Sequence, residues 1–139
     1  MNKSICVFCG ARSGNNTSFV TAAIQTGNMI AKNKWRLVYG AGDVGLMGAV
    51  ASSAQENGGT TFGVIPEHLL QREVGKRDLD QLIITDNMHS RKQIMFTNSD
   101  AIVLLPGGVG PLEEFFEVLT WAQLKIHHRP IIVLNIRKY

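Results

Sequence analysis

The segment PGGVGPLEE, residues 106–114, combines glycines and acidic side chains at a spacing that suits phosphate chemistry. Three of its glycines directly precede a predicted helix, whose amino end carries about half a positive charge. The backbone N–H groups that can face an anion there belong to Gly107, Gly108, Val109 and Gly110. No Lys-Ser/Thr pair follows, so the segment is not a Walker P-loop. It predicts a phosphate cradle built from backbone groups.

The segment MHSRK, residues 88–92, places two cations at the start of another predicted helix. Cations oppose the helix dipole at that end, so Arg91 and Lys92 need compensation by a ligand phosphate or by Glu113 and Glu114. Taken alone, the two glutamates are explained as acids in a first helical turn, an effect of up to about 1 kcal/mol. The glutamates can compensate the charges of Arg91 and Lys92 only if the two segments lie close together in the fold.

A third glycine-rich segment, YGAGDVG, spans residues 39–45 and matches G-x-G-x-x-G. It follows the second predicted strand, and the next strand does not end on an acidic residue, so the dinucleotide reading is weak. We expect close approach of a small ligand to the backbone around Gly42; a tight strand-to-helix turn is the alternative. The C-x-x-C pair, Cys6 and Cys9, lies along a predicted strand with side chains on opposite faces, which predicts buried thiols without a bound metal.

These segments connect elements that alternate along the whole chain. Short apolar runs predict strands at 4–9, 35–40, 60–66, 82–85, 101–105 and 130–135. Helical spacing predicts helices within 15–33, 44–59, 90–99 and 112–127, and the polar stretch 67–80 is predicted to be a long loop. The pattern predicts an α/β fold, a Rossmann-like parallel sheet with helices on both faces, in a single domain spanning 1–139. Such sheets bind ligands at the carboxyl ends of their strands, so the three segments and residues 10–14 should share one rim.

Composition limits the possible partners. The 139 residues are 45% hydrophobic and 18% charged, with a formal net charge of +3. No basic run indicates nucleic-acid binding, and no apolar run is long enough to span a bilayer. The first residues lack a signal-peptide layout, so we expect a cytoplasmic location.

Together, PGGVGPLEE, MHSRK and YGAGDVGLMG resemble the three signatures of the LOG ("Lonely guy") family, many of whose members were once labelled lysine decarboxylases. The family signature P-G-G-x-G-T-x-x-E aligns with residues 106–114, with Pro111 where the family has threonine. The resemblance covers essentially the whole chain, and it implies a chain shortened at its C-terminus. Decarboxylase chemistry is disfavoured, because neither Lys92 nor Lys125 lies in a recognisable pyridoxal phosphate context.

The resemblance implies a homodimer without cofactor or metal that hydrolyses the N-glycosidic bond of AMP-type 5'-monophosphates. It assigns Arg91 and Glu114 as the catalytic pair. The residues expected to contact the substrate are Gly42, Met88, Lys92, Gly107, Gly108, Val109, Gly110 and Glu113. The alternative is a Rossmann-like protein that binds a nucleotide or another phosphorylated ligand without turnover.

Overall fold

The computed structural model describes residues 3–10, 17–70, 76, 78–105 and 130–133. The strands are β1 (Ser4–Phe8), β2 (Arg36–Tyr39), β3 (Thr60–Pro66), β4 (Gln81–Thr85), β5 (Ala101–Leu104) and β6 (Ile131–Val133). The helices are α1 (Thr17–Lys32), α2 (Gly45–Glu56), the short 3-10 helix η1 (Glu67–Leu69) and α3 (Met88–Thr97). The chain alternates between strand and helix through most of this range, as its apolar patterning predicts.

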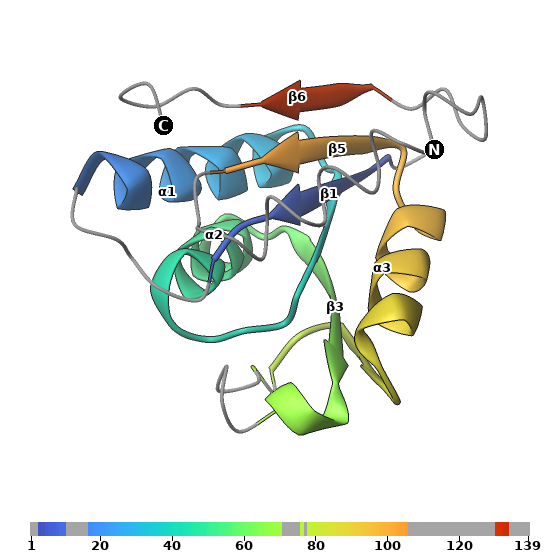
Figure 1. Ribbon diagram of the computed structural model, residues 1–139. Helices are drawn as coiled ribbons and strands as arrows, with labels where there is room; N and C mark the ends of the chain where they lie inside the picture. Colours follow the sequence, from blue (N-terminus) through green and yellow to red (C-terminus); the bar gives the residue numbers. More distant parts are fainter. Residues whose placement is uncertain (1–2, 11–16, 71–75, 77, 106–129, 134–139) are drawn as a thin grey trace.

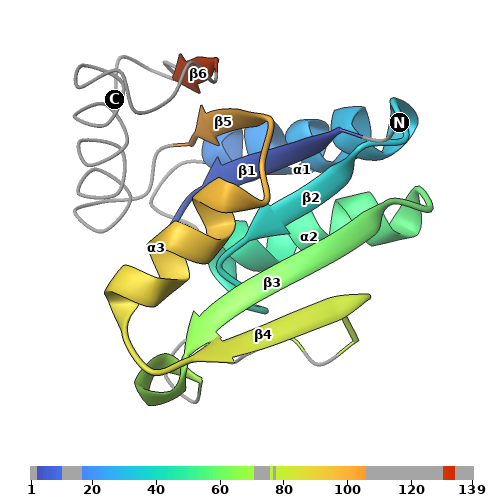
Figure 2. The same cartoon turned by 90° about the vertical axis from the view of Figure 1, so that its right-hand side faces the viewer.

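The six described strands form one parallel sheet in the order β4-β3-β2-β1-β5-β6 (Figures 1 and 2). β1 lies inside the sheet, where Cys6 pairs with Val38 of β2 on one side and Ile102 of β5 on the other. The strands step outward from β1 to β4, and the chain then returns to the opposite side of β1. The strand order therefore reverses between β1 and β5, where parallel sheets form a ligand-binding crevice.

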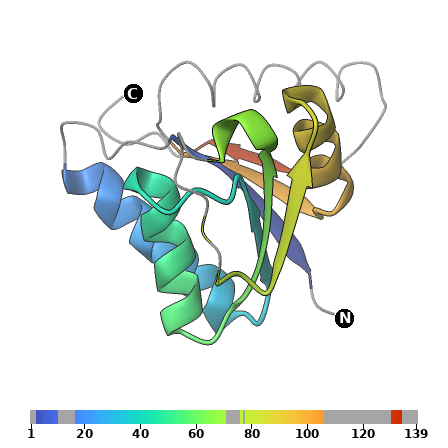
Figure 3. The ribbon, with the colours of Figure 1, turned by 90° about the horizontal axis from the view of Figure 1, so that it is seen from below.

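Helices cover both faces of the sheet. α1 and α2 lie together on one face and α3 lies on the other (Figures 2 and 3). The predicted α/β Rossmann-like architecture is confirmed for the described strands and helices. The predicted helix 112–127 lies outside the described residues.

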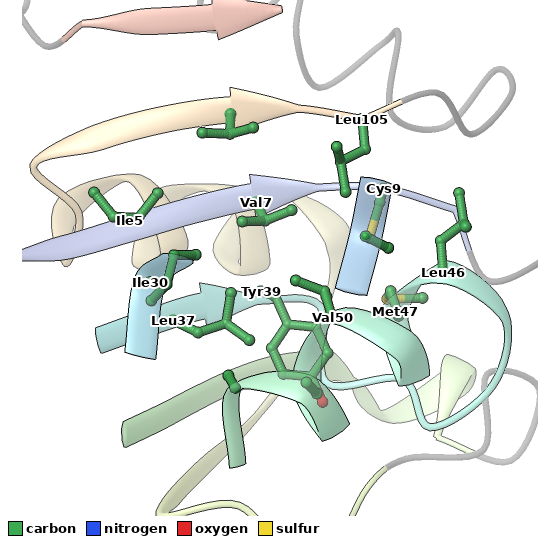
Figure 4. Packing of buried hydrophobic residues seen from close by; sticks show 14 residues of the cluster. Ile5, Val7, Cys9, Ile30, Leu37, Tyr39, Leu46, Met47, Val50 and Leu105 are labelled. Carbon is green, nitrogen blue, oxygen red and sulfur yellow. The ribbon is translucent and has the colours of Figure 1, made fainter. Parts of the chain in front are cut away.

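The two faces of β1 contribute to separate hydrophobic clusters. Ile5, Val7 and Cys9 pack with the residues of α1 and α2 (Figure 4). Cys6 and Phe8 pack on the α3 side. This alternation follows from the two-residue period of a strand. Both cysteines are buried and neither forms a disulfide, and their places in different clusters confirm the prediction that their side chains point to opposite faces.

Several element boundaries differ from those that the sequence predicts, and two of the differences have a clear local cause. α3 begins at Met88 rather than residue 90, because the side chain of Asn87 caps the helix by accepting a hydrogen bond from the Ser90 N–H at 2.8 Å. The prediction of a loop throughout 67–80 is wrong for Glu67–Leu69, which form η1 directly after Pro66 ends β3. Helix α2 ends at Glu56, inside the predicted range 44–59, and Gly58 adopts a φ of 78° just after the C-cap Asn57.

Candidate functional site

The turn that leaves β2 brings the Gly40–Asp43 segment to the carboxyl edge of the sheet. Ala41 adopts a left-handed φ of 63° and is completely buried. A non-glycine residue in this region costs about 1–2 kcal/mol, so surrounding contacts must hold it. The Tyr39 hydroxyl donates to the Gly42 carbonyl at 3.2 Å, and the Lys76 N–H donates to the Ala41 carbonyl at 2.8 Å. The segment is therefore a fixed turn, which agrees with the tight-turn alternative for YGAGDVG.

Arg91 ties the start of α3 to the ends of two strands. Its Nε donates to the Val64 carbonyl at 2.9 Å and its Nη2 to the Gly40 carbonyl at 2.6 Å. Its Nη1 also lies 3.7 Å from the Met88 sulfur. Only 4% of Arg91 is exposed, so these bonds help to offset the cost of removing the guanidinium from water. The site thus contains a cation whose position is set by the backbone of β3 and of the turn that follows β2.

Gly40 permits this close approach. A Cβ atom added at Gly40 would collide with the guanidinium of Arg91 and would lie 3.0 Å from the Met47 sulfur. Gly40 does not adopt a positive φ, so its requirement for glycine arises from space rather than from backbone conformation. Lys92, the next residue after Arg91, is also buried at 9% exposure. Two buried cations at the amino end of α3 favour an anionic ligand nearby.

Lys76 approaches the same turn from the segment between β3 and β4. Its Nζ lies 3.1 Å from Asp43 Oδ1 and 3.2 Å from Asp78 Oδ1. Burial alone would lower the pKa of Lys76, but hydrogen bonds and attraction from both carboxylates outweigh it and raise the pKa. The Lys76 hydrogen bond lowers the pKa of Asp78. Burial, reinforced by the charge of Asp43, raises the pKa of Tyr39, so its hydroxyl remains a proton donor.

The start of α2 lies beside the carboxyl ends of β1 and β5, between which the strand order reverses. The Leu105 N–H donates to the Phe8 carbonyl at 2.9 Å, so the chain leaves β5 beside the end of β1. The Met47 N–H at the start of α2 donates to the Gly10 carbonyl at 3.2 Å. Cys9, Leu46 and Leu105 gather in the core beneath this edge (Figure 4).

The structure brings part of the predicted site together. The predicted residues that it describes on this rim are Gly42, Met88, Arg91 and Lys92. The predicted residues that lie outside the described part of the chain are Gly107, Gly108, Val109, Gly110, Glu113 and Glu114. The partners expected for Arg91 were a ligand or the glutamate pair, whereas the carbonyls of Gly40 and Val64 already accept two of its hydrogen bonds.

Sequence reasoning overlooked Lys76, because it is a single lysine in a polar stretch without periodicity. Its burial and its two carboxylate partners emerge only when the chain is folded. Within the described residues, no group of three or more His, Cys, Asp or Glu side chains is placed to hold a metal ion. Among the described helices, none combines the length and apolar character needed to cross a membrane.

Comparisons with known proteins identify the family. A family model described as "Possible lysine decarboxylase" matches residues 47–139. A cytokinin riboside 5'-monophosphate phosphoribohydrolase of Arabidopsis thaliana is 46% identical over 137 residues, which cover 99% of this chain and 63% of the relative. The corresponding protein of Rhodococcoides fascians is 47% identical over 138 residues, which cover 99% of this chain and 70% of that relative. The chain thus spans less than two thirds of the Arabidopsis protein.

A solved structure supports the fold assignment. The molybdenum cofactor binding protein from Rippkaea orientalis superposes with a TM-score of 0.76 at 25% identity, covering 96% of this chain and 76% of that one. The family model covers more than half of the chain, and the Rhodococcoides relative is nearly half identical over most of its own length. The chain therefore belongs to the LOG family, whose family model bears the description "Possible lysine decarboxylase".

Proposed function

We propose that this chain hydrolyses the N-glycosidic bond of AMP-type nucleoside 5'-monophosphates, including N6-substituted ones, to the free base and ribose 5-phosphate. The observation that carries the proposal is Arg91, a buried guanidinium fixed at the carboxyl rim by two strand-end carbonyls. It occurs in a chain 46% and 47% identical to proteins named cytokinin riboside 5'-monophosphate phosphoribohydrolases. Arg91 and the adjacent buried Lys92 also supply positive charge suited to a phosphorylated substrate.

The proposed reaction uses a carboxylate, Glu114, and a cation, Arg91, in different roles. Departure of the base builds oxocarbenium-like positive charge on the ribose, which the Glu114 carboxylate stabilises while it accepts a proton from the attacking water. The bond from the sugar to the base nitrogen breaks, a bond to the water oxygen forms, and the proton that the water loses to Glu114 balances the proton that the departing base gains. Arg91 keeps Glu114 ionised and orients the sugar phosphate.

The remaining predicted residues bind the substrate in this proposal. Backbone N–H groups of the glycine-rich segment hold the 5'-phosphate at the amino end of the predicted helix 112–127. That segment comprises Gly107, Gly108, Val109 and Gly110. Gly42, Met88, Lys92 and Glu113 complete the contacts around the sugar and base. Pro111 lacks the hydroxyl and N–H that a threonine would offer the phosphate, so its replacement by threonine should strengthen binding by about 1 kcal/mol.

The decisive experiment measures free base released from AMP and from N6-substituted AMP by the wild type and by Glu114→Gln. The substitution removes the charge and keeps the shape, so kcat should fall by about a hundredfold or more while nucleotide binding persists. The matched control is Glu113→Gln, an identical charge change one residue away, for which we expect altered KM and near-normal kcat. Equal turnover by wild type and Glu114→Gln would contradict the assignment.

A second candidate function is nucleotide or phosphorylated-ligand binding without turnover. It is supported by the fold similarity to a protein named as a molybdenum cofactor binding protein, at 25% identity. The higher identity to the phosphoribohydrolases favours the hydrolase. Binding of AMP by calorimetry, with no base released by the wild type or by Pro111→Thr, would decide for the binding protein.

The proposal includes assembly as a homodimer in the cytoplasm, with residues 1–139 acting as one nucleotide-binding domain. Ile24 and Met29 on α1 are 41% and 45% exposed, which leaves apolar surface available for a second copy. Cys6 and Cys9 form no disulfide, as is usual in a reducing compartment. Light scattering at micromolar concentration tests the dimer, and a monomer mass would refute it.

A further inference from the structure

The Gly40–Asp43 turn is held by two buried cations from different parts of the chain. The Arg91 guanidinium donates to the Gly40 carbonyl at 2.6 Å. Lys76 makes two bonds to the same turn, from its backbone N–H to the Ala41 carbonyl at 2.8 Å and from its Nζ to the Asp43 carboxylate at 3.1 Å. Adjacent carbonyls of one turn are therefore bound by Arg91 and by Lys76.

The bonds of Lys76 act on the part of the turn that most needs support. Ala41 holds a left-handed φ of 63°, a conformation that persists only when neighbouring contacts enforce it. Lys76 is 8% exposed, and its ammonium lies between Asp43 and Asp78. The Asp43 side chain is 42% exposed, so the bond from the buried ammonium is what anchors it, and removal of the ammonium should loosen Asp43 and the turn.

Movement of the turn must affect Arg91, because the Gly40 carbonyl accepts one of its hydrogen bonds. The guanidinium also packs so closely against Gly40 that no side chain would fit there. We infer that Lys76 is a positioning residue that fixes the Arg91 guanidinium through the Gly40–Asp43 turn. The inference extends the proposed function, in which Arg91 is catalytic, but the mechanical link between the two cations can be measured without any substrate.

The first test measures the exchange of the Arg91 Nε–H with water by NMR, with its signal assigned from the loss of that signal in Arg91→Lys. This proton is bonded to the Val64 carbonyl. In Lys76→Met, which keeps the side-chain length and removes the charge, exchange should accelerate by about fivefold to tenfold. Lys76→Arg should stay within about twofold of wild type. Lys3→Met is the matched control, since it removes the same charge from an exposed lysine at the amino end of β1.

The second test measures kcat and KM for AMP in the same variants. Misplacement of Arg91 should lower kcat of Lys76→Met by about tenfold, and Lys76→Arg should restore most of it. A folded Lys76→Met protein with wild-type Nε–H exchange and wild-type kcat would overturn the inference. If Lys76→Met does not fold, Asp43→Asn replaces it, because that substitution weakens the same ion pair from its more exposed side.

The two readouts separate this inference from the proposed function. If the Arg91 Nε–H exchanges faster in Lys76→Met but the wild type releases no base, the result would support the positioning role and reject the hydrolase. Unchanged exchange in a series whose wild type is active would reject the positioning role and leave the hydrolase intact.

Discussion

Substitution of Gly40 by alanine tests whether the placement of Arg91 controls the chemistry. The added Cβ would occupy the space of the guanidinium, which is the far end of a flexible side chain and can move away. The cost is then the charged hydrogen bond from Nη2 to the Gly40 carbonyl, worth about 1.5–3 kcal/mol. Alanine offsets about 0.4–1 kcal/mol of this by restricting the unfolded chain. The free energy of unfolding should therefore fall by about 1–2 kcal/mol.

The effect on catalysis should be larger than this stability loss suggests. If the lost placement of Arg91 is felt in the transition state, kcat for base release should fall by about tenfold to a hundredfold, since each 1.36 kcal/mol corresponds to a factor of ten. The assays are base release from AMP and urea denaturation of the same preparations.

Gly58→Ala is the matched control for Gly40→Ala. Gly58 has a φ of 78° and open space around its position, so alanine should cost about 1 kcal/mol of stability through backbone strain alone. It lies after α2, away from Arg91, and its kcat should stay at the wild-type value. The double variant Gly40→Ala/Arg91→Lys should be no slower than Arg91→Lys alone, because both changes disrupt one arrangement. Wild-type kcat in Gly40→Ala would refute the reasoning.

Three further predictions concern stability. Tyr39→Phe removes a buried hydrogen bond to the turn and should lower the free energy of unfolding by about 1 kcal/mol in urea denaturation. Asp80→Ala removes bonds from the Thr61 N–H at 2.8 Å and hydroxyl at 3.1 Å; it should cost about 1–2 kcal/mol and leave kcat unchanged, because Thr61 lies at the amino end of β3. The stability difference between wild type and Lys76→Met should depend on pH. Because folding raises the pKa of Lys76, the stability that its charge contributes is complete below about pH 10.4 and is lost as the pH rises through the folded pKa. Because folding lowers the pKa of Asp78, the stability that its charge contributes is complete above about pH 3.9 and is lost as the pH falls through the folded pKa. Denaturation from pH 3 to 11 should show the largest difference between about pH 5 and 9, and a constant difference would contradict the ion-pair account.

Much of the fold could be predicted because it depends on periodicity. The run SICVF is apolar throughout after Ser4, which predicts a strand buried on both faces, and in the fold its residues divide between two apolar clusters. The start of α3 was less predictable, because Asn87 competes with later residues as a cap and only the bond to the Ser90 N–H decides.

The hydrogen bonds and ion pairs within the site could not be predicted in the same way. Arg91 and Gly40 are 51 residues apart, and Lys76 and Asp43 are 33 apart. The acceptors of Arg91 are backbone carbonyls, which every residue possesses, so the sequence contains no signal for their choice. The motifs point to the residues of the site, whereas the contacts among those residues depend on the fold.

The central place of β1 has a consequence for the order in which this protein folds. β1 can pair with β2 across a separation of about 32 residues, as between Ser4 and Arg36, but its pairing with β5 joins residues about 96 apart, such as Ile5 and Ala101. Closing the longer loop costs about 1 kcal/mol more in chain entropy. On a ribosome, strands β1 to β4 can assemble while β5 is still being synthesised. We therefore expect the crevice between β1 and β5 to form last, so a nascent chain acquires most of its sheet before it can bind a ligand.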